Sequence, residues 1–226
     1  MTGAMVTALR LLAIAVFGLI VVGTVMPVVM GEAHGDGRLT TSDGDTVDIT
    51  DEARSAGFTF APGVAAGDRE WILQAIARAR PEAARLIAEV DGLVVVGTFS
   101  AGGTTLGITR GHERGFTVDL NVAYLNGERA LDRATVVLHE LGHVIDFALV
   151  PEALDVQLDG QIPRGGPCGA AIDCELMEER FADTFAKWAL NGAVSQIGAG
   201  YGIAMPASIE DWGAPLSELA YSLPAA

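Results

Sequence analysis

Residues 136–145 read VVLHELGHVI, an apolar stretch that carries two histidines and one glutamate. The stretch lies inside residues 132–150, which we predict to form a helix. His139 and His143 are four residues apart, so on a helix both imidazoles project from the same face and can bind one Zn²⁺ ion. Glu140 lies beside that face, where its carboxylate can accept a proton from water at the metal. The spacing predicts a metal site on a buried helix.

A zinc site of this kind needs a third protein ligand and one coordination position left open for water. The strongest candidate is Glu179, which lies in another predicted helix, residues 175–191. Asp183 follows Glu179 by four residues and shares its helix face, so it can accept a hydrogen bond from the far nitrogen of a ligating histidine. Asp146 follows His143 by three residues. We expect it in the outer shell of the site, because another ligand from the same helix would crowd the metal.

The rest of the chain predicts one helix, then strands, then further helices, an order typical of an α+β fold. Apolar residues recur at helical spacing over residues 67–90, where Pro81 is expected to kink or divide the helix. Residues 46–50 alternate and predict a short edge strand. Further strands are predicted at residues 93–99, 105–110 and 116–125, and a last helix at residues 208–223, interrupted near residues 213–215. We expect a small antiparallel or mixed sheet packed on the two helices that carry the candidate ligands.

Residues 11–30 form an uncharged apolar run, which as a helix of roughly 30 Å is long enough to cross a bilayer. Arg10 precedes the run and acidic residues follow it, so the positive-inside rule keeps the N-terminus in the cytoplasm and exports the rest. Two interpretations stay open: a cleaved signal peptide, with residues 31–33 (GEA) as the cleavage site, or an uncleaved signal anchor. Both predict an extracytoplasmic protein, either secreted or anchored to the cell membrane.

By composition the chain divides into a signal or anchor segment (residues 1–33), a polar linker (residues 34–60) and one folded domain (residues 61–226). The formal net charge of −15 argues against a nucleic-acid partner, because phosphate neutralisation needs clustered Lys and Arg. Cys168 and Cys174 are the only cysteines. We expect them to form a short disulfide in an oxidising compartment, with two free thiols as the alternative.

The two motifs resemble those of the gluzincins, zinc peptidases that carry HExxH on one helix and a glutamate ligand on a later one. The closer likeness is to the anthrax lethal factor-like group, which shows HExGHxxD and Glu-x-Phe-Ala-Asp/Glu-x-Phe patterns. Here the matching stretches are residues 139–146 (HELGHVID) and residues 179–185 (ERFADTF), a small part of the chain. The resemblance implies a zincin-like fold with Glu140 as the general base and Asp183 orienting His139. It implies one Zn²⁺ ion with three protein ligands: His139, His143 and Glu179.

One departure from that group concerns a tyrosine that precedes the third-ligand helix and helps to stabilise the tetrahedral intermediate. Residues 144–178 contain no tyrosine. Tyr201 or Tyr124 could substitute as an oxyanion donor, although packing is the simpler role for each. Peptidases of this architecture hold the substrate as an extra strand on a sheet edge, and residues 116–121 (FTVDLN) are our candidate for that edge.

These patterns predict a zinc endopeptidase that acts on peptides or proteins outside the cytoplasmic membrane. One alternative is a cell-surface binding module that retains zinc without turnover; the missing tyrosine favours it, and the intact Glu140 argues against it. A second alternative is an acidic interaction protein in which the HExxH pattern is incidental. In that case Glu179 and Asp183 would form a solvated helix face.

Overall fold

A computed structural model of the chain describes residues 38–40, 46–48, 57–113, 115–164, 176–193 and 203–223. The strands are β1 (Arg38–Thr40), β2 (Thr46–Asp48), β3 (Thr59–Phe60), β4 (Val94–Phe99), β5 (Gly107–His112) and β6 (Gly115–Asn121). The helices are α3 (Ala66–Ile76), α4 (Pro81–Val90), α5 (Val122–Leu125), α6 (Arg133–Leu149), α7 (Glu152–Asp159), α8 (Met177–Ala189) and α9 (Ile209–Ser222). Two 3-10 helices, η1 (Asp91–Leu93) and η2 (Ala130–Asp132), precede β4 and α6. The α+β class predicted from the sequence is confirmed.

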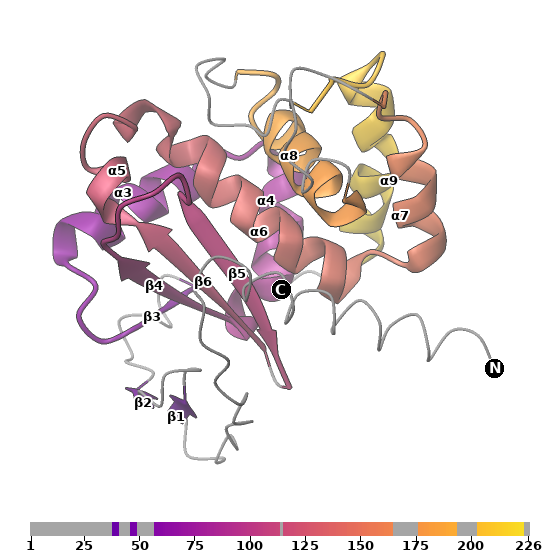
Figure 1. The fold of residues 1–226 in the computed structure, drawn as a ribbon. Coiled ribbons are helices and arrows are strands. Elements are labelled where there is room, and N and C mark those ends of the chain that lie inside the picture. Colours follow the sequence, from indigo (N-terminus) through magenta and orange to yellow (C-terminus); the bar gives the residue numbers. More distant parts are fainter. Residues whose placement is uncertain are drawn as a thin grey trace.

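Four strands form a mixed sheet in the order β3-β4-β6-β5, seen in Figure 1. β3, β4 and β6 are parallel, whereas β5 runs antiparallel to β6 at the edge of the sheet. The prediction that residues 116–121 form a free edge is wrong, because these residues of β6 pair with β4 on one side and with β5 on the other. Among the described strands, β5 is the edge strand on that side. β1 and β2 pair in a separate two-stranded sheet, which confirms a short strand within residues 46–50.

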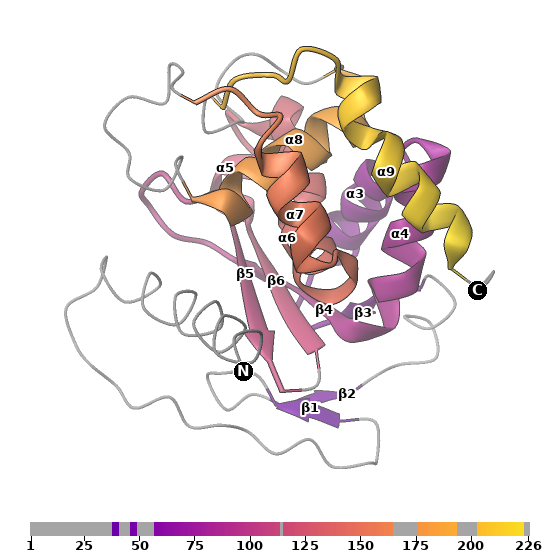
Figure 2. The same ribbon diagram turned by 90° about the vertical axis from the view of Figure 1, so that its right-hand side faces the viewer.

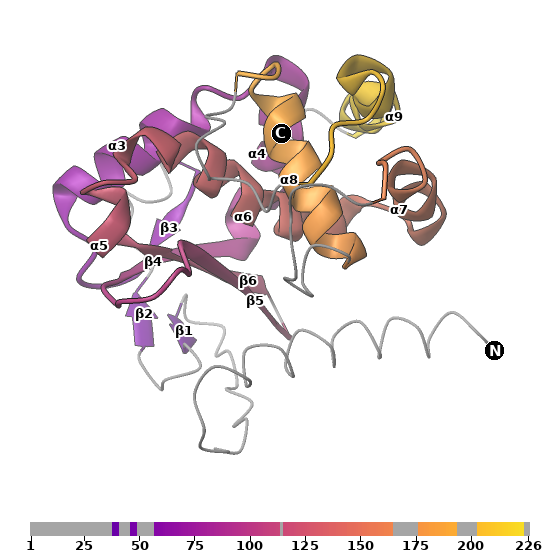
Figure 3. The ribbon, with the colours of Figure 1, turned by 45° about the horizontal axis from the view of Figure 1, so that its top comes forward.

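Helices α3, α4 and α6 cover one face of the four-stranded sheet, above it in Figure 3. Val94 and Val96 of β4 and Val118 and Leu120 of β6 point into that layer and are buried. Helix α8 packs across α6, while α9 lies beside α4 and α8, as Figure 2 shows. Helix α6 is therefore enclosed by the sheet, by α3 and α4, and by α8.

Two boundaries in this fold follow from single residues. Pro81 is the first residue of α4, so the helix predicted over residues 67–90 is divided there, as proline at a first helical position favours. The strand predicted over residues 116–125 ends at Asn121. The side chain of Asn121 accepts a hydrogen bond from the Ala123 backbone N–H and caps α5, which replaces the last predicted strand residues.

The C-terminal helices differ from the prediction in two respects. Helix α9 is continuous, so the interruption predicted near residues 213–215 is wrong. A Cβ atom at Gly213 would lie 1.9 Å from Nε1 of Trp188, so this glycine allows α9 to approach α8 closely. Helix α7 was not predicted, although Pro151 and the acidic first-turn residues Glu152 and Asp155 are ordinary signals of a helix start.

The N-terminal boundary of the folded domain lies earlier than residue 61. Phe58 and Phe60 are buried in the core, and β3 pairs with β4, so residues 57–60 belong to the domain rather than to the linker. The predicted signal or anchor segment, residues 11–30, lies outside the described residues. Within the described ranges, no helix has both the length and the apolar character to cross a bilayer.

Candidate metal centre

The candidate site is built on α6, which is a helix buried on every side. Every residue from Ala134 to Asp146 is buried, including the three polar residues of the motif. His139 and Glu140 are each 4% exposed, and His143 is 7% exposed. Burying imidazole and carboxylate groups costs free energy unless they are paired or coordinate a metal, so these three side chains need partners inside the fold.

A close contact between two small residues brings α8 to the motif. A Cβ atom at Gly142 would lie 3.0 Å from Cα and 3.2 Å from the carbonyl oxygen of Ala182, which belongs to the backbone of α8. Backbone atoms of a packed helix cannot move aside as a flexible side chain can, so the helices reach this separation because residue 142 is glycine. Ala182 lies one turn after Glu179, and the contact therefore brings Glu179 to the histidines.

His139, His143 and Glu179 form a cluster in which one candidate ligand atom from each lies within 4.8 Å of the others. Nε2 of His139 is 3.2 Å from Oε2 of Glu179, and Nε2 of His143 is 3.6 Å from Oε1. Two imidazole nitrogens and a carboxylate oxygen are a common ligand set for divalent metal ions. The three residues predicted as ligands are thus together in the fold and could hold a metal ion.

Burial and the neighbouring charged groups shift the pKa values of Glu179, His143 and Glu140. Burial favours a higher pKa for Glu179, but His143 and His139 outweigh burial and hold the pKa of Glu179 far below its usual range. Burial favours a lower pKa for His143, but the nearby Glu179 carboxylate outweighs burial and raises that pKa. Glu140 has the opposite balance, because burial is the dominant effect and raises its pKa. Glu179 is therefore held as a carboxylate, whereas burial makes protonation of Glu140 easier.

Glu140 lies against the edge strand β5. The hydroxyl of Thr109 lies 2.7 Å from Oε2 and 3.1 Å from the backbone oxygen of Glu140. A Cβ atom at Gly107 would lie 2.4 Å from Oε1 of Glu140, so only glycine leaves room for the carboxylate at that position. The edge strand and the candidate base are in direct contact.

Asp183 lies one turn beyond Glu179 and is 1% exposed. Its Oδ2 pairs with Nζ of Lys187, which also donates a 2.7 Å hydrogen bond to the carbonyl oxygen of Ile203. Among the described residues, the buried Oδ1 of Asp183 has no hydrogen-bond partner. Asp146 is also buried, at 2% exposed. The hydrogen bond that Asp183 is expected to accept from His139 and the place of Asp146 in the outer shell of the site stay predictions.

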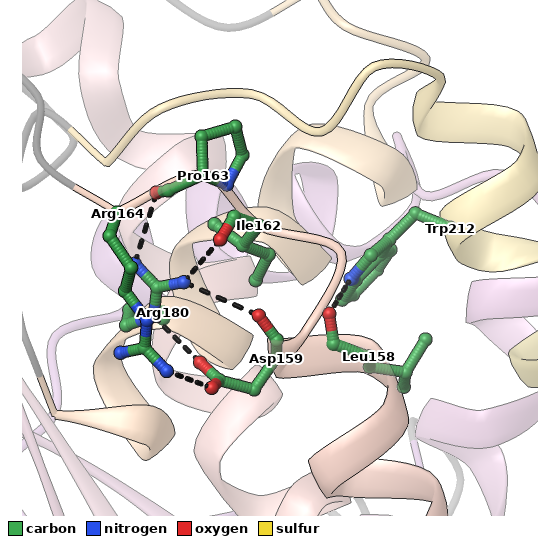
Figure 4. Close-up of polar contacts among 7 residues, drawn as sticks. All are labelled: Leu158, Asp159, Ile162, Pro163, Arg164, Arg180 and Trp212. Atoms are coloured by element: carbon green, nitrogen blue, oxygen red, sulfur yellow. Dashed lines mark hydrogen bonds and ion pairs between the residues drawn. The ribbon is translucent and has the colours of Figure 1, made fainter.

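The first turn of α8 is held from its other side by Arg180, the residue after Glu179. Arg180 is 2% exposed, and its Nε donates a 2.6 Å hydrogen bond to Oδ1 of Asp159 at the end of α7 (Figure 4). Its terminal nitrogens donate to the carbonyl oxygens of Asp159, Ile162 and Pro163. The planar guanidinium thereby fastens the C-terminal end of α7 to the helix that carries Glu179.

Replacing Asp159 by alanine is expected to lower the free energy of unfolding by about 3 kcal/mol, because it leaves the buried Arg180 charge without its carboxylate. Arg164 pairs with the same carboxylate, but its side chain is 58% exposed. Arg164→Ala is the matched control and should cost less than about 1 kcal/mol. Urea unfolding of both variants measures the difference, and equal small losses would contradict the structural role given to Arg180.

Three predicted site residues cannot be placed: Tyr201, Cys168 and Cys174 lie outside the described residues. Tyr124, the other tyrosine considered as an oxyanion donor, accepts a 3.1 Å hydrogen bond from the backbone N–H of Gly103. Its hydroxyl is thus bonded to the segment between β4 and β5.

Sequence reasoning missed the residues that contact the motif from other elements. Thr109 contacts Glu140 although 31 positions separate them, and Asp159 and Arg180 are 21 positions apart. The i, i+4 spacing of Asp183 and Lys187 on one helix could have revealed that ion pair. No local pattern marks the other contacts, because tertiary packing creates them.

Comparisons with models of known protein families, with curated protein sequences and with solved structures found no match to this chain.

Proposed function

We propose that this chain is a zinc-dependent peptidase with a zincin-like catalytic domain. The observation that carries the proposal is the buried cluster of His139, His143 and Glu179, with Glu140 beside the first ligand. Two histidines and a glutamate leave a fourth position open, which is the arrangement of catalytic rather than structural zinc sites. The ligand set also suits other transition metals, and the choice of zinc rests on the HExxH spacing.

In this proposal three residues hold the metal ion, and Glu140 transfers the proton. A Zn²⁺ ion held by the three ligands would supply Lewis-acid polarisation of the scissile carbonyl group. Glu140 accepts the proton of the attacking water and later gives it to the leaving amine, so the carboxylate ends the cycle as it began.

Strand β5 supports a peptide rather than a small-molecule substrate. It lies at the sheet edge, and its residues Gly107 and Thr109 contact Glu140. An extended peptide can add to such an edge through main-chain hydrogen bonds, which fixes it without a particular side-chain sequence. We propose β5, in place of residues 116–121, as the strand on which the substrate lies.

The place of action is proposed from the N-terminal sequence. Residues 11–30 are long and apolar enough to direct export, and Arg10 with the acidic residues after the run sets the orientation. We therefore propose that the domain works outside the cytoplasmic membrane, on peptides or proteins found there. The formal charge of −15 makes nucleic acid an unsuitable partner.

The test uses the purified full-length chain, its metal content and a mixed peptide library. We expect about one zinc per chain, cleavage of internal peptide bonds, loss of cleavage after chelation and recovery on adding Zn²⁺. Zinc without any cleavage would instead support the silent binding module. A chain that retains no divalent metal would support the acidic interaction protein and defeat the proposal.

A further inference from the structure

The edge strand β5 carries two residues that face the candidate base and that no motif identifies. Gly107 and Thr109 pair with Leu120 and Val118 of β6, both of which point into the core beneath the helices. Paired residues of neighbouring strands point to the same face of a sheet, so residues 107 and 109 face α6. Residues 108, 110 and 112 face the other way.

The contacts from these two positions fix the Glu140 side chain on both sides of its carboxylate. Thr109 Oγ1 lies 2.7 Å from Oε2, and a Cβ atom at Gly107 would lie 2.4 Å from Oε1 and 2.7 Å from Cδ. The carboxylate therefore lies against the bare backbone of Gly107, with one oxygen held by a hydroxyl. A long side chain that is held in this way loses rotamer entropy. The entropy is lost when the protein folds, so it adds nothing to the activation free energy of the reaction.

We infer that Thr109 is a positioning residue for Glu140, and that β5 sets the geometry between the base and the substrate. This inference rests on the proposed function, because it gives Glu140 the role of general base. Since a peptide added to the edge of β5 would take its register from the same strand, one strand would fix both reacting partners.

The hydroxyl is suited to this task because it can donate and accept a hydrogen bond. It lies between two acceptors of one residue, the carboxylate oxygen at 2.7 Å and the backbone oxygen at 3.1 Å. While Glu140 is a carboxylate, the hydroxyl donates to it. After Glu140 has taken a proton from water, the hydroxyl can donate to the backbone oxygen and accept from the carboxylic acid. The side chain stays bonded through both halves of the proton transfer.

The test compares Thr109→Val, which keeps the shape and strand preference, with Thr109→Ser, which keeps the hydroxyl. We expect the valine variant to lower kcat by roughly 10- to 100-fold, because small displacements of a reacting group have effects of that order. KM and zinc content should stay near wild type, and the serine variant should recover kcat to within about threefold. A valine variant as active as wild type, or a serine variant as slow as valine, would overturn the inference.

Thr117→Val is the matched control. Thr117 lies on β6 opposite Arg110, so it faces away from α6, where its hydroxyl lies 3.2 Å from Nε2 of His112. The same substitution there should leave kcat unchanged. A loss equal to that of Thr109→Val would show that the sheet is merely sensitive to this change.

A second measurement needs no activity and keeps the two proposals apart. In metal-free protein, Thr109→Val should lower the melting temperature less in a Glu140→Ala background than with Glu140 present, because the carboxylate partner is already gone. Equal losses would show that Thr109 does not hold the Glu140 side chain. If wild type cleaves no peptide, the proposed function fails and the catalytic role of Thr109 fails with it, while this comparison still decides whether the contact exists.

Discussion

Replacing Glu140 by glutamine should abolish peptide cleavage while leaving the metal in place. Glutamine has the shape of glutamate, and Thr109 can still donate to its side-chain oxygen, 2.7 Å away in the native carboxylate. An amide cannot take a proton from water at neutral pH, so the variant loses the general base and kcat/KM should fall by about a thousandfold. Peptide cleavage rates, metal content by mass spectrometry and thermal unfolding together measure the effect.

Glu152→Gln provides the control for that experiment. Glu152 is exposed at the start of α7, and the same loss of charge there should leave cleavage at the wild-type rate. The decisive comparison is the loss of cleavage at full metal occupancy. Undiminished cleavage by Glu140→Gln would rule out this residue as the base, and loss of metal from the variant would assign it a structural role instead.

Replacing Glu179 by alanine should remove the metal itself. The carboxylate is the only candidate ligand from α8 among the described residues, and its oxygens lie 3.2 Å and 3.6 Å from the two histidine nitrogens. Loss of a hydrogen-bond partner behind a ligand costs roughly 10- to 100-fold in metal affinity, so loss of a ligand should cost at least about 100-fold. Competition with a chromogenic chelator measures the affinity.

The same variant should lose the stabilisation that metal gives to the folded state. A metal ion at about 100 times its dissociation constant stabilises the folded protein by about 2.7 kcal/mol, and a 100-fold weaker site reduces that gain to about 0.4 kcal/mol. Glu178→Ala is the matched control, because Glu178 occupies the same turn outside the ligand cluster. Equal metal affinity in the two variants would show that Glu179 is not a ligand.

The two helices that carry the candidate ligands were predictable because their information is local. The spacing of His139 and His143 fixes a helix face, and Glu179 sits in a stretch with apolar residues at helical spacing. Pro81 likewise marks the first residue of α4. These features depend on neighbours within a turn or two of the chain, so one sequence suffices to predict them.

The strand order was not predictable in the same way. Residues 116–121 form a central strand because they pair with both β4 and β5, and a strand's own residues do not reveal its neighbours. The extent of β6 depended on the cap at Asn121, and α9 runs through Pro215 with its apolar face buried. The strand order and the continuity of α9 depend on tertiary contacts, whereas the end of β6 depends on a local cap that the alternation of residues did not reveal.

In the candidate site, the residues of one helix could be predicted from the sequence, whereas the contacts made by other elements could not. His139, Glu140 and His143 were named from one helix, whereas Thr109 reaches Glu140 from a strand that no motif marks. In the sequence, Gly142 stands out only as the glycine of the HExGHxxD pattern. Its physical reason, the approach to the backbone of Ala182, becomes clear in three dimensions.

Lys187 is the only lysine in the chain, and it is 8% exposed. Its amine is paired with Asp183 and bonded to the carbonyl oxygen of Ile203, so the folded domain presents no accessible lysine side chain to acylating reagents. Modification at this position then requires α8 to open. The rate at which a single lysine reacts would therefore report opening of the helix behind the candidate metal centre, without any engineered label.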